Sequence, residues 1–388
     1  MKRLIPLIIG SPRNVTLDWL RGLSALAVFS GHLRAALLVD FSSLATSNIF
    51  HKLFYLITGL GHQAVIIFFA LSGYLVGGSI IRSLKNTSTI SIKKYSITRI
   101  TRLWTVLIPS LFFTLLADRL LALISPQTLS GHYRDIWNSG PTTDAYSATI
   151  KTFICNLLFL QNIASPVYGT NGTLWSLANE FWYYAIFPCM AILIFKKSPI
   201  VKRVISLVML IGMSISLPPS LLQYFSLWFL GAVAAFVFIY YPTPICARYS
   251  YIGLISSWTL LVAMIIFSKL SILGWSSFNY DALVAAATSI LVLVSSNVTI
   301  PPAKRVKVKL GHLALALSET SYSLYLFHFP AVILVAAAFF PRQFQPTPVG
   351  MLWYVLTLLL IWMFCGCMWF VFERNTNLIR NNFREYLR

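Results

Sequence analysis

The sequence has few charged residues and very few acidic ones. Of its 388 residues only 10% are charged, and Asp and Glu together number 10. Because soluble domains carry about 25% charged residues, this scarcity excludes a chain made mainly of soluble domains. Hydrophobic residues are abundant instead: they make up 57% of the chain, and the mean hydropathy is +0.76. The composition predicts a polytopic membrane protein.

Cysteine is also scarce, and its placement argues against a disulfide framework or a zinc site. The five cysteines are Cys155, Cys189, Cys246, Cys365 and Cys367. Four of them lie in or beside apolar stretches, and none has the spacing of zinc ligands. We therefore expect no metal cofactor.

Apolar stretches long enough to cross a bilayer recur along the chain. A transmembrane helix needs about 20 apolar residues. By this measure we predict ten spans, near residues 15–37, 59–81, 103–124, 174–195, 202–217, 221–240, 250–268, 281–298, 320–340 and 349–372. The expected fold class is all-α, with about ten transmembrane helices.

Basic residues are distributed unevenly between the two sides of the predicted membrane. The net charge of +20 could indicate a nucleic-acid partner. With the N-terminus inside, however, 23 of the 30 basic residues fall in cytoplasmic segments. The positive-inside rule accounts for this pattern with both termini cytoplasmic, so we expect no nucleic-acid binding. Part of the excess could also bind anionic lipid head groups or an anionic ligand.

We expect one transmembrane domain over residues 1–388, with a cytoplasmic N-terminus at 1–14 and a cytoplasmic tail at 373–388. One extracytoplasmic connection, residues 125–173, is much longer than the others. It contains TIKTFICNLLFLQNI, which is too short to span and predicts an interfacial or re-entrant helix. A connection of this length usually has a function.

The first predicted span carries ionisable residues within an apolar helix. It contains Asp18, Arg21 and His32, and such groups in hydrocarbon usually face a protein interior and act there. Arg21 and His32 are eleven residues apart, which places them on one helix face about 16 Å apart. His32 is either a general base, since an imidazole takes up protons near neutral pH, or a structural hydrogen-bonding group between helices.

A carboxylate lies in the span that begins near residue 174. Counted from the start of that span, Glu180 is about 9 Å deep, a depth comparable to that of His32. The two are candidates for a pair in which the carboxylate orients the imidazole. A structural pair, or a carboxyl group kept neutral by burial, is equally open. Trp175 and Tyr183 in the same span either line a cavity or belong to an aromatic belt at the interface.

Arginines gather at the expected cytoplasmic mouth of the spans. Arg99 and Arg102 are three residues apart on one helix face, and Arg21 lies a turn or two inside the same side. Converging guanidinium groups suit a phosphate-rich ligand, because each can bind oxygens bidentately. The alternative is that they are topogenic charges at the lipid head groups, which explains Arg21 less well.

Two further spans contain polar residues that can line a cavity. FFALSGYL places Ser72 beside a glycine, and small residues there predict close helix contact. SYSLYLFHFP brings Tyr322, Tyr325 and His328 into one span, with Pro330 expected to kink the helix just beyond. A polar cavity lining and a direct chemical role are equally open for these three side chains.

Taken in order, these motifs resemble the acyltransferase 3 family of integral-membrane O-acyltransferases, which O-acetylate bacterial surface polysaccharides such as lipopolysaccharide. The motifs are LDWLRG followed by His32, FFALSGYL, RITRLW, LWSLANEFWYY and SYSLYLFHFP, and the resemblance runs over residues 17–372. The arginine–ten residues–histidine motif of the family corresponds to Arg21 and His32. Its paired-arginine motif corresponds to Arg99 and Arg102, and its glutamate motif to Glu180.

The resemblance implies an acyl-coenzyme A donor, usually acetyl-CoA from the cytoplasm, and a sugar hydroxyl as acceptor. The chain departs from the family pattern in two places. Ser318 and Glu319 stand where the family commonly has Gly and a basic residue. Glu373 and Arg374 are followed by Asn375, where the family commonly has Pro. Both departures affect the inner mouth and leave the class unchanged.

We therefore expect an O-acetyltransferase of the bacterial inner (cytoplasmic) membrane that acts on a cell-surface or lipid-linked glycan. Arg21, Arg99 and Arg102 would bind the donor phosphates. His32 would deprotonate the acceptor or carry the acyl group, with Glu180 orienting it. The side chains expected to line the path are Ser72, Trp175, Tyr183, Tyr322, Tyr325 and His328. The alternative is a proton-coupled transporter in which His32 and Glu180 relay protons.

Overall fold

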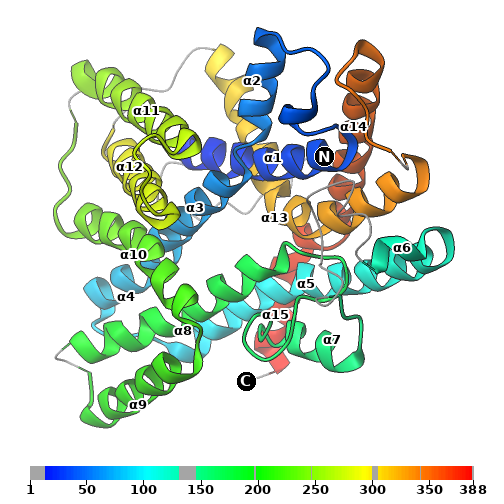
Figure 1. Cartoon of the computed structure of the whole chain (residues 1–388). Helices are drawn as coiled ribbons and strands as arrows, with labels where there is room; N and C mark the ends of the chain where they lie inside the picture. The colour runs from blue at the N-terminus through cyan, green and yellow to red at the C-terminus, as the bar shows by residue number, and fades with distance from the viewer. Residues whose placement is uncertain are drawn as a thin grey trace.

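The computed structural model describes residues 14–130, 146–195, 198–245, 247–298, 305–340 and 342–386. These residues form helices, and no β-strand occurs among them (Figure 1). The predicted all-α class is therefore confirmed. The helices are α1 (Val15–Leu37), α2 (Ile49–Thr58), α3 (Gly61–Ser72), α4 (Gly78–Thr87), α5 (Ile92–Ile124), α6 (Pro126–Leu129), α7 (Ile150–Leu157), α8 (Leu174–Ile194), α9 (Ile200–Ser216), α10 (Pro219–Tyr240), α11 (Ala247–Leu270), α12 (Ser277–Asn297), α13 (Arg305–Phe339), α14 (Pro348–Val371) and α15 (Thr376–Tyr386).

Some predictions fall on residues outside these ranges. They concern the first thirteen residues of the N-terminal segment, residues 131–145 of the long connection, Cys246, and residues 387–388 of the predicted tail.

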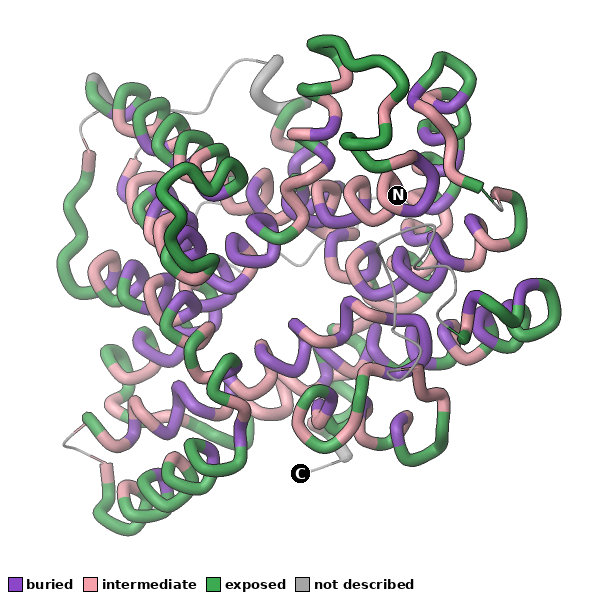
Figure 2. Tube along the Cα trace, in the orientation of Figure 1, coloured by how far each residue is buried: buried purple, intermediate pink, exposed green. Residues whose placement is uncertain are grey.

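Eight helical segments of the described chain are long and apolar enough to cross a membrane. They are Ile49–Thr87, Ile92–Ile124, Leu174–Ile194, Pro219–Tyr240, Tyr249–Leu270, Ser277–Asn297, Leu310–Phe339 and Pro348–Glu385. The other two predicted spans are α9, which has 17 residues, and α1, which has 23 residues but carries Asp18, Arg21, His32 and Arg34. In Figure 2 the outward faces of α9 and α11 are largely exposed, as expected for helices that contact lipid.

Helices α1 and α13 pack side by side and run in the same direction. Arg21 of α1 contacts Ser318 of α13, and further along both helices His32 contacts His328. A Cβ atom on Gly22 would lie 2.5 Å from Leu317 Cβ, so the absence of a side chain at Gly22 allows this close approach. We call the end at which α1 begins the proximal side and the end at which it finishes the distal side.

Helix α3 continues through a π-helical turn, η2 (Gly73–Gly77), into α4. Here the chain is in backbone contact with α10. A Cβ on Gly73 would lie 1.8 Å from the carbonyl oxygen of Trp228, and one on Gly231 would lie 1.9 Å from that of Ala70. The close helix contact predicted for the FFALSGYL motif is confirmed.

The described part of the long connection, residues 146–173, folds against the distal ends of α5, α8 and α13. This segment contains the short helix α7. Trp104 of α5 donates a hydrogen bond to the carbonyl oxygen of Leu157, and Trp182 of α8 donates one to that of Phe159. The segment just before α8 is deeply buried, with Thr170 and Asn171 both 0% exposed. Helix α8 therefore starts inside the protein, beneath this segment.

Candidate active site

The imidazoles of His32 and His328 form a hydrogen-bonded pair at the distal end of α1 and α13. His32 Nδ1 lies 2.9 Å from His328 Nε2. The side chain of His32 keeps part of its surface accessible, whereas His328 is buried. Phe329 packs edge-on against His32, with 4.7 Å between ring centroids, and Phe29 packs edge-on against His328. These contacts hold both rings in fixed orientations.

Pro330 leaves carbonyl groups of α13 free just below this pair, because proline has no N–H and its ring displaces the neighbouring helical bonds. The segment before α8 satisfies them. Asn171 Nδ2 donates to the carbonyl oxygen of Leu326 at 3.0 Å, and Thr173 Oγ1 donates to that of Tyr325 at 3.2 Å. The segment thus fixes α13 at the turn that carries His328.

A buried carboxylate anchors this segment to α5. Asp118 accepts hydrogen bonds from the backbone N–H of Thr170 at 3.1 Å and from its hydroxyl at 2.6 Å. Gly169 is required here because its φ is +56° and a Cβ would lie 2.1 Å from Asp118 Oδ2. Burial, followed by the nearby Asp118 carboxylate, raises the pKa of the Tyr168 hydroxyl. The sequence assigned no role to Asp118 or Asn171. The sequence did offer one signal. Pro330 lies inside an expected span, and the backbone carbonyl groups that a proline leaves free need hydrogen-bond donors from elsewhere.

Glu180 lies deeper than its position in α8 suggests. Its Oε1 accepts hydrogen bonds from the hydroxyl groups of Ser72, at 2.7 Å, and Tyr184. Trp228 Nε1 donates to Ser72 Oγ at 3.1 Å. Ser72 is the last residue of α3. Glu180 is therefore held by side chains of α3 and α8, and Trp228 of α10 bonds to the same serine.

Three arginines, Arg21, Arg99 and Arg102, form what we call the arginine cluster, on the proximal side of Glu180. Arg21 interacts electrostatically with Arg102, Glu180 and Glu373, and its Nη1 lies 3.3 Å from Ser318 Oγ. Arg99 lies over the rings of Tyr95 and Tyr184 at 5.6 and 5.8 Å.

Both arginines of α5 retain capacity to bind a ligand. The side chain of Arg102 is exposed. Within the described residues, Arg99 Nε has no hydrogen-bond partner. The exposed Arg102 guanidinium therefore has donors available for an anion, and the partly exposed Arg99 adds its positive charge.

Helix α15 brings two more arginines to the same place, which the sequence did not predict. Arg384 Nη2 donates to Thr98 Oγ1 on α5 at 3.0 Å. Arg380 interacts electrostatically with Arg99 and Arg102. In Figure 1, α15 lies beside α5. The sequence signal was available, because Arg380 and Arg384 are four residues apart on one face of an amphipathic tail.

A stripe of polar side chains along α13 lies between the arginine cluster and the His32–His328 pair. Ser318, Tyr322, Tyr325 and His328 follow one another at helical spacing on one face. Tyr322 donates to the carbonyl oxygen of Leu103 at 3.1 Å, and the hydroxyl groups of Tyr325 and Ser176 are 2.6 Å apart. The rings of Tyr325 and His328 lie 6.1 Å apart. This stripe runs beside the face of α1 that carries Arg21 and His32.

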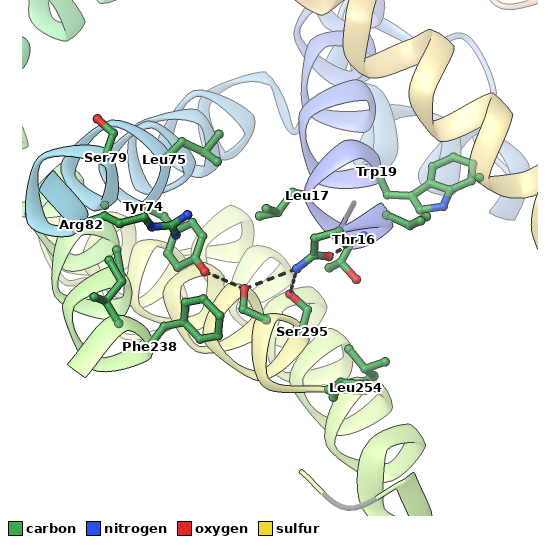
Figure 3. Close-up of a pocket in the computed structure, with 18 of the residues that line it drawn as sticks. Thr16, Leu17, Trp19, Tyr74, Leu75, Ser79, Arg82, Phe238, Leu254 and Ser295 are labelled. Atoms are coloured by element: carbon green, nitrogen blue, oxygen red, sulfur yellow. Dashed lines mark hydrogen bonds between the residues drawn. The ribbon is translucent and has the colours of Figure 1, made fainter. Parts of the chain in front are cut away.

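A cavity of about 1310 Å³ opens at the proximal side between α1, α4, α10, α11, α12 and the start of α13 (Figure 3). Leu17, one helical turn before Arg21, lies in its wall. Arg82 lies beside Tyr74, whose hydroxyl donates to Ser296 at 2.7 Å. Among the described side chains, Arg82 is the arginine that lines this cavity, and Arg99 and Arg102 are not among its lining residues.

The family model described as an acyltransferase domain, that of the acyltransferase 3 family, matches residues 14–372. The chain belongs to this family. It is therefore a membrane acyltransferase by family, and its apolar helices make it a multi-pass membrane protein. No curated protein and no solved structure matches the chain significantly.

In the structure, the predicted catalytic and donor-binding residues of this acyltransferase 3 protein separate into two groups. The arginine cluster and Glu180 share one electrostatic environment, whereas the hydrogen bond of His32 goes to His328 and not to Glu180. The expected histidine–carboxylate pair is thus replaced by a pair of imidazoles. Glu180 lies too far towards the proximal side, because α8 begins beneath buried chain.

Three predicted cavity-lining residues, Ser72, Tyr183 and His328, are packed inside the protein instead. Tyr183 is 0% exposed, donates to the carbonyl oxygen of Leu221 at 3.1 Å, and packs against Phe69 and Trp228. His328 is likewise 0% exposed and reaches the site through His32. Trp175 lies against Phe69, with 6.3 Å between the rings, and keeps part of its surface accessible.

Proposed function

We propose that this acyltransferase transfers an acetyl group from acetyl-CoA to a hydroxyl group of a cell-surface or lipid-linked glycan. The proximal side would face the cytoplasm of a bacterial cell, and the protein would lie in the inner membrane. The observation that carries the proposal is the arrangement along α1, which presents Arg21 at one end, beside Arg102 of α5, and His32 at the other. Family membership supports acyl transfer as the reaction class.

The donor would bind with its phosphates at the arginine cluster. Arg102 is exposed, Arg99 has an unpartnered Nε within the described chain, and Arg380 and Arg384 add positive charge nearby. Guanidinium groups bind phosphate oxygens bidentately, and several together suit a ligand with more than one phosphate. On the same side, the cavity of about 1310 Å³ with Arg82 in its wall offers space for the nucleotide.

The pantetheine arm would run along the polar stripe of α13 towards His32. Arg21 and His32 are separated by about 16 Å along α1, a length that the extended arm can bridge. The donor thioester would then lie beside the imidazole, while the phosphates stay among the arginines. Tyr322 and Tyr325 lie between the two ends on the neighbouring helix.

The transfer would proceed by general-base catalysis. His32 takes the proton of the acceptor hydroxyl as its oxygen forms a bond to the thioester carbonyl carbon. The carbon–sulfur bond then breaks, and the imidazolium returns the proton to the departing thiolate. The products are an acetylated sugar and free coenzyme A.

The experiment that tests the proposal follows the acetyl group. Membranes that contain the protein are incubated with acetyl-CoA labelled in the acetyl group, and the glycan fraction is analysed for covalent label. Mass spectrometry of surface glycans from cells with and without the gene checks the product. Label on a glycan that depends on the gene supports transfer.

Label that never becomes covalent, together with gene-dependent movement of a solute, would instead support the transporter alternative. That alternative needs a proton relay between His32 and Glu180, and each of these residues hydrogen-bonds elsewhere.

A further inference from the structure

The hydrogen bonds of His328 determine which of its ring nitrogens carries a proton. His328 Nδ1 lies 2.7 Å from the carbonyl oxygen of Leu324. A carbonyl oxygen can only accept a hydrogen bond, so Nδ1 must be protonated. His328 is 0% exposed, and a charged imidazole there would lose its hydration without a counter-charge in the bonds it makes. The ring is therefore neutral, and its Nε2 carries a lone pair.

The same reasoning extends to His32. Because His328 Nε2 has no hydrogen, it must accept the bond from His32 Nδ1, which is 2.9 Å away. His32 Nδ1 is thus the protonated nitrogen, and His32 Nε2 carries the lone pair. The packing of Phe329 against His32 opposes rotation of the ring. Arg34, two residues further along α1, turns away towards Tyr55 and Asp40.

We infer that His328 is a positioning residue that locks the tautomer of His32, so that His32 Nε2 takes the proton from the acceptor hydroxyl. This inference rests on the proposed function. When Nε2 takes up the proton, His32 becomes an imidazolium and keeps its Nδ1–H bond to His328. His328 in turn keeps its own bond to the Leu324 carbonyl. In a serine-protease triad a carboxylate fixes the tautomer, whereas here a neutral imidazole does so.

The direct test is nitrogen NMR of the protein labelled with ¹⁵N-histidine. The chain has six histidines, and the His32 signals are identified by their loss in His32→Asn. We expect a single neutral tautomer in the resting protein, with Nδ1 protonated and Nε2 unprotonated. A protonated Nε2 on His32, in either a neutral or a charged ring, would overturn the inference.

Two variants at position 328 separate tautomer control from a packing role. His328→Leu removes the acceptor, and His328→Gln supplies an amide oxygen in its place. In His328→Leu we expect mixed tautomers of His32 and an apparent kcat for transfer from labelled acetyl-CoA that is about 10²-fold lower. The KM for acetyl-CoA should stay within about threefold, because His328 acts on the base and does not contact the bound donor. His328→Gln should restore the single tautomer and most of kcat.

A His328→Leu protein with an unchanged tautomer and unchanged kcat would overturn the inference. If this variant does not fold, as judged by thermal unfolding, the wild-type spectrum alone decides. Failure of the proposed function has a different signature. Wild-type protein with the expected tautomer but no acetyl transfer would overturn the proposed function and, with it, the role of His32 Nε2. Acetyl transfer by a protein whose His32 Nε2 is protonated would overturn this inference alone.

Discussion

The two ends of the α1–α13 pair differ sharply in charge. The proximal end brings together the arginine cluster, Arg380 and Arg384, with Glu180 and Glu373 nearby. The distal end holds two imidazoles that bond to each other, enclosed by Phe29 and Phe329. Arg21 and the two imidazoles lie on α1 and α13, whereas α5 and α15 supply the other arginines. One end concentrates fixed charge, and the other surrounds a proton acceptor with aromatic rings.

This difference indicates a division of labour between binding and chemistry. A guanidinium cluster holds a phosphate-rich group but cannot take up a proton near neutral pH, because arginine stays protonated. An imidazole exchanges protons but contributes little to binding several phosphates. If the division is correct, variants at the two ends should affect different kinetic parameters.

The largest effect is expected from removing the imidazole. His32→Ala should lower the rate of acetyl transfer by about 10²- to 10⁴-fold, because general-base catalysis typically contributes this much. The measurement is gene-dependent incorporation of labelled acetyl groups into glycan. His312→Ala is a matched control, since His312 is an exposed histidine on α13, and it should retain the wild-type rate. Wild-type transfer by His32→Ala would refute the assignment of the base.

The next effect is expected at the proximal end. Arg102→Ala should raise the KM for acetyl-CoA roughly 10- to 100-fold, since one charge-assisted hydrogen bond contributes about 1.5–3 kcal/mol. The KM of Arg102→Lys should lie between those of the wild type and Arg102→Ala, because lysine keeps the charge but loses the bidentate geometry of the guanidinium. Steady-state kinetics over a range of acetyl-CoA concentrations measures this.

Arg119→Ala is the matched control for Arg102, because Arg119 is an exposed arginine near the distal end of the same helix. Its KM should be unchanged. Equal KM values for Arg102→Ala and the wild type would remove the arginine cluster from donor binding.

A smaller effect is expected where Glu180 is held in place. Gly73→Ala places a Cβ 1.8 Å from the Trp228 carbonyl oxygen, so η2 and α10 must separate next to Ser72. We expect a loss of about 1–3 kcal/mol in the free energy of unfolding, measured as a lower unfolding temperature in detergent. Gly212→Ala is the control, since nothing lies within 4 Å of its added Cβ. Equal unfolding temperatures for the two variants would show that this backbone contact is unimportant.

The smallest effect concerns the support of the imidazole pair. Asn171→Ala leaves the Leu326 carbonyl without its donor and should lower the free energy of unfolding by about 1–2 kcal/mol. Pro330→Ala returns a backbone N–H to α13, which can bond to the Leu326 carbonyl. Asn171→Ala should therefore lower the free energy of unfolding less in the Pro330→Ala background than in the wild type. A double-mutant cycle measures this coupling, which we expect to be about 0.5–1 kcal/mol. Strictly additive effects would show that Asn171 does not compensate for the proline.

Much of this architecture is predictable from the sequence because it depends on local pattern. Hydropathy predicted the helices, and the ionisable residues of α1 stood out because such groups are rare in apolar segments. The partner of His32 could not be predicted, because His328 is 296 residues away and only the packing of α13 on α1 brings them together. Glu180 was placed too near the distal surface, because depth was counted from a helix start that is itself buried under residues 146–173.

Equilibrium binding of a non-transferable acetyl-CoA analogue tests the division of labour most directly. The account predicts that His32→Ala binds the analogue with the wild-type Kd and has lost transfer, while Arg102→Ala binds it roughly 10- to 100-fold more weakly. Equal loss of affinity in both variants, or full affinity in Arg102→Ala, would contradict the account.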